Sequence, residues 1–287
     1  MSFRDLLVVL RPYPAGTADS AIDYAVATAV ALGARTSAVA CGVAPKVPRS
    51  ILGNALLDVS AMVGNERMKS TADARRLLKR FEEAIAANRG VLGERILRTC
   101  QSFEVAEVLV SHSRLYDLTL LPMPEGDYVS QFDALWYAET IIFGSGHPTI
   151  VLPPQRKDSG RVVLDKVIAA WDRSRPAARS ISDAIPILQK AKQVRLLTVT
   201  GEKSISSEGS GGEFARHLAL HGVNVAVDEV NAGGRTIGEV LQEQAKVHEI
   251  DLIVMGAYGH SRFREFILGG ATKSMLAHPP TALFLSH

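Results

Sequence analysis

Four glycines lie close together near the end of the chain, in the stretch GAYGHSRFREFILGG at residues 256–270. An apolar run at 251–255 precedes this stretch, and a helical pattern at 271–277 follows it. Glycine lets a ligand approach the backbone closely, and the free N–H groups at the start of a helix attract anions. The spacing Gly-x2-Gly-x9-Gly therefore predicts a phosphate-binding loop between a strand and a helix.

Two features of this loop leave alternatives open. Thr272 falls in the first turn of the expected helix, where its hydroxyl would either donate to a phosphate oxygen or cap the helix. The glycine spacing is neither the Walker pattern GxxxxGK[ST] nor the dinucleotide pattern GxGxxG, and neither motif occurs in the chain. Glycines also serve plain turns, so the motif gains its value from its position after a strand and before a helix.

The elements that must position this loop occur twice along the chain. Each half opens with an aspartate and a short apolar strand, DLLVVL from Asp5 and DKVIAAW from Asp165, followed by a helical stretch and a second strand. Each half closes with His-Pro and a final strand, at residues 147–152 and 278–285. The shared order of these signals indicates an internal duplication.

A linker composition separates the two halves. Residues 153–161, PPQRKDSGR, combine proline, glycine and charge between two apolar strands, so we predict domains at 1–154 and 161–287. Strands that alternate with helical patterns predict an α/β fold: two tandem doubly wound, Rossmann-like domains, each a five-stranded and mostly parallel sheet flanked by helices. In such sheets ligands bind beyond the carboxyl ends of the strands, where the strand order reverses.

The second half resembles a known nucleotide-binding family. Gly256-x2-Gly259-x9-Gly269, then GGAT, an apolar helix and a last strand after His-Pro-Pro, is similar to the signature of the universal stress protein family. The tandem arrangement resembles two-domain members of that family, so the likeness covers nearly the whole chain. The resemblance implies a stress-response protein that binds an adenine nucleotide, ATP with or without Mg²⁺, and acts through assembly or partner contacts.

The resemblance also implies a role for individual residues. Asp172 stands where the family's first strand ends in an adenine-contacting aspartate, although it would equally serve as a helix N-cap. Val199 matches a backbone contact to adenine. Gly270 departs from the family, which usually has serine or threonine directly after the third glycine. The implied nucleotide site comprises Asp172, Val199, Gly256, Gly259, His260, Gly269, Gly270, Ala271 and Thr272.

The first half lacks these features. The place of Asp172 falls on Pro12, and no Gly-x2-Gly follows its fourth strand; Gly144 and Gly146 have no helical stretch after them. We therefore expect the first domain to bind no nucleotide and to act as a structural or regulatory partner of the second. The resemblance further implies that the two closing strands pair within the chain as a pseudo-dimer, and it leaves a homodimer open.

Other functions find little support in the sequence. The 287 residues carry a net charge of +2 with acidic and basic residues interspersed, which indicates no nucleic-acid partner. The apolar run near the amino terminus is too short for a signal peptide or a membrane span, so we expect a cytoplasmic protein. The two cysteines, Cys41 and Cys100, have no metal-ligand spacing and are expected to be core thiols in a reducing compartment.

The sequence assigns no catalytic residue. Neither HExxH nor GxSxG occurs, and His260 is the histidine nearest the expected phosphates. Phosphoryl transfer also needs a base and magnesium ligands, which cannot be named here. Three hypotheses remain: a nucleotide-binding stress protein, a scaffold of the same fold that binds no nucleotide, and a slow ATPase.

Overall fold

The computed structural model describes residues 2–13, 16–44, 59–125, 128–154, 162–201, 210–257 and 270–287. At residues 44, 59–62, 128–134 and 210 it describes the backbone alone. Helices and strands alternate throughout these ranges. The first half contains β1 (Asp5–Leu10), α1 (Asp19–Leu32), β2 (Arg35–Ala44), α2 (Val59–Ala87), β3 (Val91–Gln101), α3 (Val105–Ser113), β4 (Leu118–Pro122), α4 (Tyr128–Gly144) and β5 (Thr149–Leu152). The second half contains β6 (Lys166–Ala170), α5 (Arg175–Leu188), β7 (Gln193–Thr200), α6 (Ser210–Leu220), β8 (Val225–Asn231), α7 (Ile237–Val247), β9 (Leu252–Gly256), α8 (Gly270–Ala277) and β10 (Ala282–Ser286).

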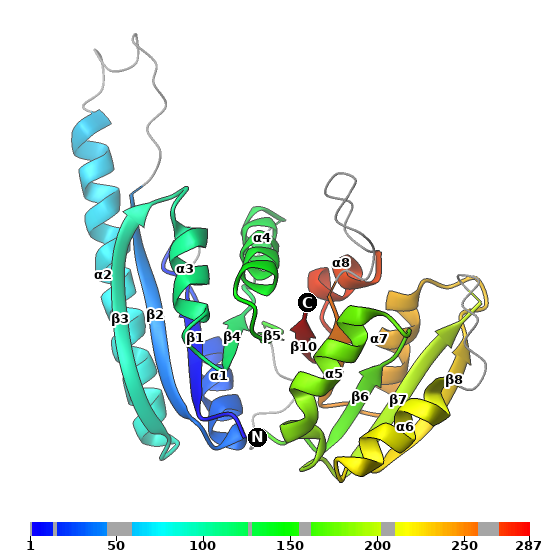
Figure 1. Ribbon diagram of the computed structural model, residues 1–287. Helices are drawn as coiled ribbons and strands as arrows, with labels where there is room; N and C mark the ends of the chain where they lie inside the picture. Colours follow the sequence, from blue (N-terminus) through cyan, green and yellow to red (C-terminus); the bar gives the residue numbers. More distant parts are fainter. Residues whose placement is uncertain are drawn as a thin grey trace.

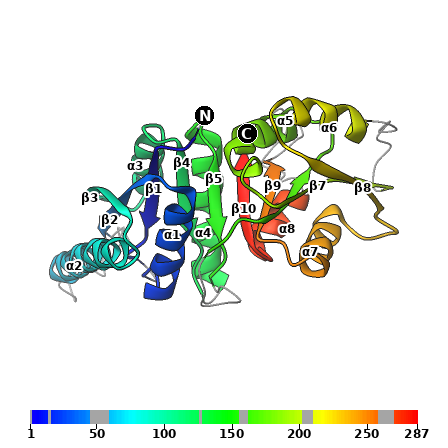
Figure 2. The same cartoon turned by 90° about the horizontal axis from the view of Figure 1, so that it is seen from below.

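The strands of the described chain form one ten-stranded sheet in the order β3-β2-β1-β4-β5-β10-β9-β6-β7-β8. All neighbouring strands are parallel except β5 and β10, which are antiparallel and pair Ile150 with Phe284. Figure 1 shows helices on both sides of the sheet, and Figure 2 shows β5 and β10 side by side at its centre. The expected pairing of the two closing strands is confirmed, so the two predicted five-stranded sheets join edge to edge.

Two apolar cores lie on the two faces of this sheet. Along β1, Leu6 and Val8 enter one core and Leu7 and Val9 the other, as the alternation of side chains along a strand requires. Helices α1, α2, α5 and α6 contribute to the first core, and α3, α4, α7 and α8 contribute to the second. Strands buried on both faces read as continuous apolar runs, which is why the sequence showed them clearly.

The same polar contact fixes the start of the first strand in each half. The Oδ2 atom of Asp117 accepts hydrogen bonds from the backbone N–H groups of Arg4 and Asp5, at 2.7 and 3.1 Å. The Oδ2 atom of Asp251 accepts two equivalent bonds, at 3.0 and 2.9 Å, at the start of β6. This repetition supports the duplication that the sequence indicates.

The α/β fold predicted from the sequence is confirmed, and the division at 154 and 161 stays a prediction, since residues 155–161 lie outside the described ranges. No helix within the described ranges is long and apolar enough to cross a membrane.

Candidate functional site

The strand order of the second half reverses between β6 and β9. From β6 the chain proceeds to β7 and β8 on one side, and it then returns to place β9 on the other side. A crevice beyond the carboxyl ends of the strands at such a reversal is the usual ligand site in doubly wound sheets. Asp172 follows β6 and Gly256 ends β9, so both predicted site residues lie at the carboxyl ends of the two strands that flank this reversal.

Asp172 is held in a tight turn between β6 and α5. Its side chain is exposed, and its Oδ1 atom accepts a hydrogen bond from the backbone N–H of Ser174 at 2.9 Å. Arg173, between them, has a φ of 61°, an uncommon value for a residue other than glycine. The carboxylate is thus fixed at the strand end with a second oxygen available to a ligand.

Ser174, and not Asp172, is the N-cap of α5. Its Oγ atom accepts a hydrogen bond from the backbone N–H of Ala177 at 3.2 Å, and Pro176 occupies the first turn. The alternative interpretation of Asp172 as the helix cap is therefore wrong. Sequence reasoning missed Ser174 although a signal was present, because serine followed by proline in the first helical turn is a typical helix start.

Val199 lies beyond the point where β6 stops pairing with β7. The ladder ends at the pair of Ala170 with Leu197, after which the N–H of Trp171 still donates to the Leu197 oxygen at 2.9 Å. Residues two apart on a strand direct their backbone groups to the same side, so Val199 directs its own toward the space beyond the end of β6. Its side chain is buried against Ala232 and Val240.

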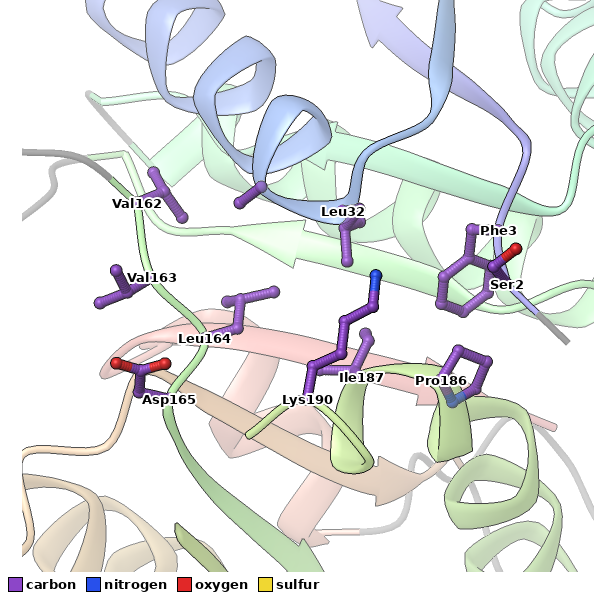
Figure 3. Close-up of a pocket in the computed structure, with 11 residues that line it drawn as sticks. Ser2, Phe3, Leu32, Val162, Val163, Leu164, Asp165, Pro186, Ile187 and Lys190 are labelled. Atoms are coloured by element: carbon purple, nitrogen blue, oxygen red, sulfur yellow. The ribbon is translucent and has the colours of Figure 1, made fainter. Parts of the chain in front are cut away.

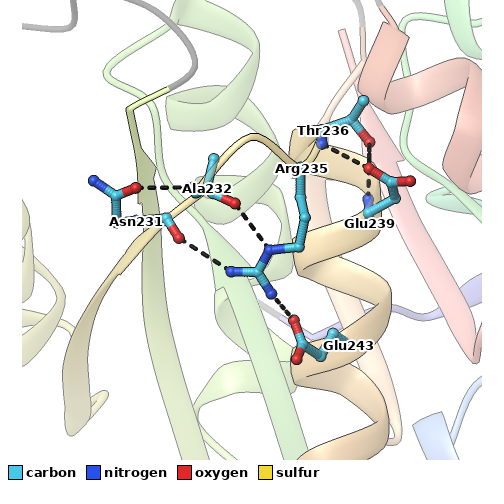
Figure 4. Close-up of polar contacts among 7 residues, drawn as sticks. Asn231, Ala232, Arg235, Thr236, Glu239 and Glu243 are labelled. Carbon is cyan, nitrogen blue, oxygen red and sulfur yellow. Dashed lines mark hydrogen bonds and ion pairs between the residues drawn. The ribbon is translucent and has the colours of Figure 1, made fainter.

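The loop that supports Val199 is fixed by Arg235 (Figure 4). The guanidinium donates to the backbone oxygens of Ala232 and Asn231, at 2.8 and 3.1 Å, and forms an ion pair with Glu243 on α7. These bonds tie the end of β8 to the following helix. The wall beside Val199 is therefore built by polar contacts within the protein and does not depend on a ligand for its shape.

Helix α7 begins in a reciprocal capping box (Figure 4). The Thr236 Oγ1 atom accepts from the Glu239 N–H at 3.2 Å, and the Glu239 carboxylate accepts from the Thr236 N–H at 2.7 Å. That backbone hydrogen bond, followed by the one from the Thr236 hydroxyl, lowers the pKa of Glu239 below its ordinary value of 4.5. Because the pKa is lowered by folding, the stabilisation is present above pH 4.5 and is lost as the pH falls through the folded-state pKa.

Thr236→Ala is therefore expected to lower the thermal midpoint by roughly 2–4 °C at neutral pH. Part of this difference comes from the hydrogen bond that the Thr236 hydroxyl donates to the Glu239 carboxylate, and that part should be lost as the pH falls through the folded-state pKa of Glu239. Thermal unfolding at pH 7 and pH 3 measures this, with Thr140→Ala as the control, since the Thr140 hydroxyl bonds a carbonyl of its own helix. A difference that stays constant across pH would show that the Thr236 hydroxyl does not stabilise the ionised Glu239.

Gly256 has a packing role that the sequence did not reveal. A Cβ atom built there would lie 2.5 Å from the Ala177 nitrogen and 2.5 Å from the Pro176 carbonyl carbon, at the start of α5. Its φ is not positive, so the need for glycine here is steric and does not come from a left-handed backbone. The absence of a side chain at Gly256 thus lets α5 pack on the end of β9, whether or not a ligand also approaches.

The last predicted residues occupy the first turn of α8. Gly270, Ala271 and Thr272 are the first three residues of this helix, so their backbone N–H groups point toward its amino end. Gly270 is exposed and faces open space, whereas the Thr272 side chain is only 4% exposed. The amides of Gly270 and Ala271 are therefore better placed to meet a phosphate than the Thr272 hydroxyl. Gly259, His260 and Gly269 lie outside the described residues.

Two hollows among the described residues lie at the amino ends of strands, the end opposite to Asp172 and Gly256. One, of about 160 Å³, is lined mainly by apolar side chains with the Lys190 ammonium among them (Figure 3). The other, of about 560 Å³, shares the segment 162–165 and includes Asp251. Both border the amino ends of strands, and neither is lined by Asp172 or Gly256.

The sequence of the second half matches a known family model. Residues 164–285 match the model described as the universal stress protein family. No curated protein sequence matches the chain.

Solved structures share the fold over the whole chain. A universal stress protein from Archaeoglobus fulgidus DSM 4304 is similar with a TM-score of 0.69 and 15% identity, covering 98% of this chain and 95% of that one. A putative universal stress protein from Pseudomonas aeruginosa UCBPP-PA14 is similar with a TM-score of 0.58 and 14% identity, covering 99% and 93%. These likenesses extend the fold to the first half of the chain.

Proposed function

The chain carries a domain of the universal stress protein family over residues 164–285, and from that premise we propose that this half binds an adenine nucleotide, ATP in the first instance. The observation that carries the proposal is the exposed carboxylate of Asp172, held by the Ser174 N–H at the reversal of strand order. A fixed and exposed acceptor at the carboxyl ends of the strands suits the amino group of adenine.

Both the adenine end and the phosphate end of the nucleotide would have suitable partners. The carboxylate of Asp172 would accept from the adenine amino group, and the backbone of Val199 would meet the ring nitrogens. The amides of Gly270 and Ala271 would hold a phosphate at the start of α8, where the helix dipole also favours an anion. The chemistry of this donor set fits a nucleotide without any side-chain cation.

A magnesium ion would depend on the nucleotide. Within the described ranges, three or more histidine, cysteine, aspartate or glutamate side chains do not gather anywhere in a way that could hold a metal. Magnesium usually keeps several waters and binds through substrate phosphates, so ATP would supply its main ligands here. The described residues also offer no base for phosphoryl transfer that we can name, and we propose binding without assigning hydrolysis.

The first half would serve as a partner and not as a second nucleotide site. Arg11 and Pro12 follow β1 where the second half has Trp171 and Asp172, so the acceptor for adenine is missing. Gly144 is explained by packing, since a Cβ there would lie 2.9 Å from a methyl group of Val110. We propose that nucleotide occupancy in the second half alters assembly or partner contacts during the stress response.

A scaffold that binds no nucleotide is the second candidate. The packing role of Gly256 and the burial of Thr272 favour it, because both residues are then explained without a ligand. One measurement distinguishes the nucleotide-binding protein from the scaffold. Denaturing freshly purified protein and chromatographing the released small molecules should yield adenine nucleotide near one per chain; none released, and none bound on titration, would establish the scaffold.

Asp172→Asn is expected to weaken adenine-nucleotide binding by roughly 10–100-fold. Asparagine keeps an oxygen for the Ser174 N–H, so the turn should persist, but its amide NH₂ replaces the acceptor that adenine needs. Isothermal titration calorimetry measures the change, and unfolding midpoints check that the fold is unaltered. Asp165→Asn, at the other end of β6 and bonded to Lys192, is the control and should bind like the wild type. An affinity of Asp172→Asn equal to that of Asp165→Asn and the wild type would refute the assignment of Asp172.

A further inference from the structure

The two cysteines of the chain meet on neighbouring strands. The register of β2 with β3 pairs Cys41 with Arg98 and Val43 with Cys100. Paired residues of parallel strands face the same side of the sheet, and so do residues two apart on one strand. Cys41 and Cys100 therefore point to the same face, and both side chains lie in the second core.

Two cysteines that lie side by side in this way are uncommon enough to be informative. A buried residue typically touches 6–12 others, so the second cysteine of a 287-residue chain would be among them by chance in only roughly 2–4% of cases. Both thiols are free. Core packing alone accounts for one small buried residue at each position, but it gives no reason for two thiols to lie on the same face of neighbouring strands.

The two thiols are not equivalent. Cys41 is 2% exposed, whereas Cys100 is 9% exposed and stands next to the last residue of the edge strand β3. The Cys41 thiol hydrogen-bonds the sulfur of Cys100, which lowers the pKa of Cys100 against the opposing effects of burial and Glu104. The same bond and burial raise the pKa of Cys41, while Arg98 acts in the opposite direction. Cys100 is thus the thiol that ionises first, with Cys41 as a neighbouring proton donor.

We propose that Cys100 and Cys41 form a thiol-oxidation site, in which a small peroxide oxidises Cys100 and Cys41 then closes an intrachain disulfide. In the first step the Cys100 thiolate attacks one oxygen of hydrogen peroxide; the O–O bond breaks, a sulfenic acid forms and, with one proton, water leaves. In the second step the Cys41 sulfur attacks the Cys100 sulfur; the S–O bond breaks, and the Cys41 proton leaves with the hydroxyl as a second water. The two thiols lose two electrons, which the peroxide accepts.

The position of the two thiols on the same face of neighbouring strands makes the second step intramolecular. A resolving thiol held beside a sulfenic acid captures it before further oxidation, as is common for redox-sensing cysteines. Cys100 belongs to the edge strand, whose outer side has no neighbouring strand in the described sheet, so a small oxidant need cross little protein to reach it. The resulting bond would cross-link β3 to β2.

The test follows oxidation of the full-length protein by mass spectrometry. Reduced protein, freed of reductant, is treated with hydrogen peroxide, then unfolded and alkylated with N-ethylmaleimide. The expected product has lost the mass of two hydrogen atoms, takes up no maleimide and regains both thiols with dithiothreitol. In Cys41→Ser, dimedone should trap a sulfenic acid on Cys100, and in Cys100→Ser the oxidation of Cys41 should be at least about tenfold slower.

A second readout needs no variant, in case a serine in the core prevents folding. Native wild-type protein is alkylated in a time course, and peptide mapping compares the two thiols. Cys100 should react at least about tenfold faster than Cys41 in the folded protein, and the difference should vanish in urea. Two maleimide-reactive thiols after peroxide, a disulfide only between chains, or faster reaction of Cys41 would each overturn the proposal. None of these outcomes depends on nucleotide binding.

Discussion

Gly256→Ala is expected to lower the free energy of unfolding by about 2–4 kcal/mol. The added Cβ would stand 2.5 Å from backbone atoms of both Pro176 and Ala177, and backbone cannot rotate away as a flexible side chain does. The start of α5 must therefore shift off the end of β9. Because Ser174 caps the same helix start and holds Asp172, the shift should also displace the proposed adenine acceptor.

The matched control for this change lies in the same glycine motif. A Cβ at Gly270 would meet nothing within 4 Å, and this residue begins a helix without a positive φ. Gly270→Ala should therefore leave stability within about 1 kcal/mol of the wild type, or raise it slightly, because alanine restricts the unfolded chain. Urea unfolding of both variants measures the contrast. Similar effects of the two substitutions would show that the contact with α5 is not what requires Gly256.

The difference between Gly256 and Gly270 separates what could be predicted from the sequence from what could not. The order of strands and helices could be read from apolar runs and helical spacing because strands buried on both faces leave a strong local signal. Strand β3 lies at the exposed edge of the sheet, where only part of the strand is buried and the apolar pattern is interrupted by charged residues. Edge strands give a weaker pattern for that reason.

The places of the predicted site residues in the fold could be read from the sequence more easily than their surroundings. The positions of Asp172 and Gly256 at strand ends followed from the order of the elements, but the atoms that face Gly256 come from a helix far away in the sequence. The burial of Thr272 likewise depends on how α8 packs on the sheet. Contacts of this kind, including that between Cys41 and Cys100, are set by tertiary packing and leave no local pattern to read.

The pairing of the two halves also involves one side chain, Phe284, whose neighbours could not be predicted from the sequence. Phe284 is fully buried in β10, is paired with Ile150 of β5 and Val254 of β9, and its ring lies 6.4 Å from the ring of Phe3 near the start of the chain. Residues from both halves therefore surround it. Loss of this ring should weaken the whole ten-stranded sheet and not the second half alone.

Phe284→Ala is accordingly expected to cost about 3–5 kcal/mol of unfolding free energy, through lost burial and the cavity left behind. Phe103→Ala is the matched control, because that ring is 68% exposed and its removal should cost less than about 1 kcal/mol. Chemical unfolding followed by tryptophan fluorescence reports on both halves, since Trp136 lies in the first and Trp171 in the second. If the halves are coupled through β5 and β10, both signals shift together to lower denaturant. A shift confined to the signal of Trp171 would show that the two halves unfold independently despite their shared sheet.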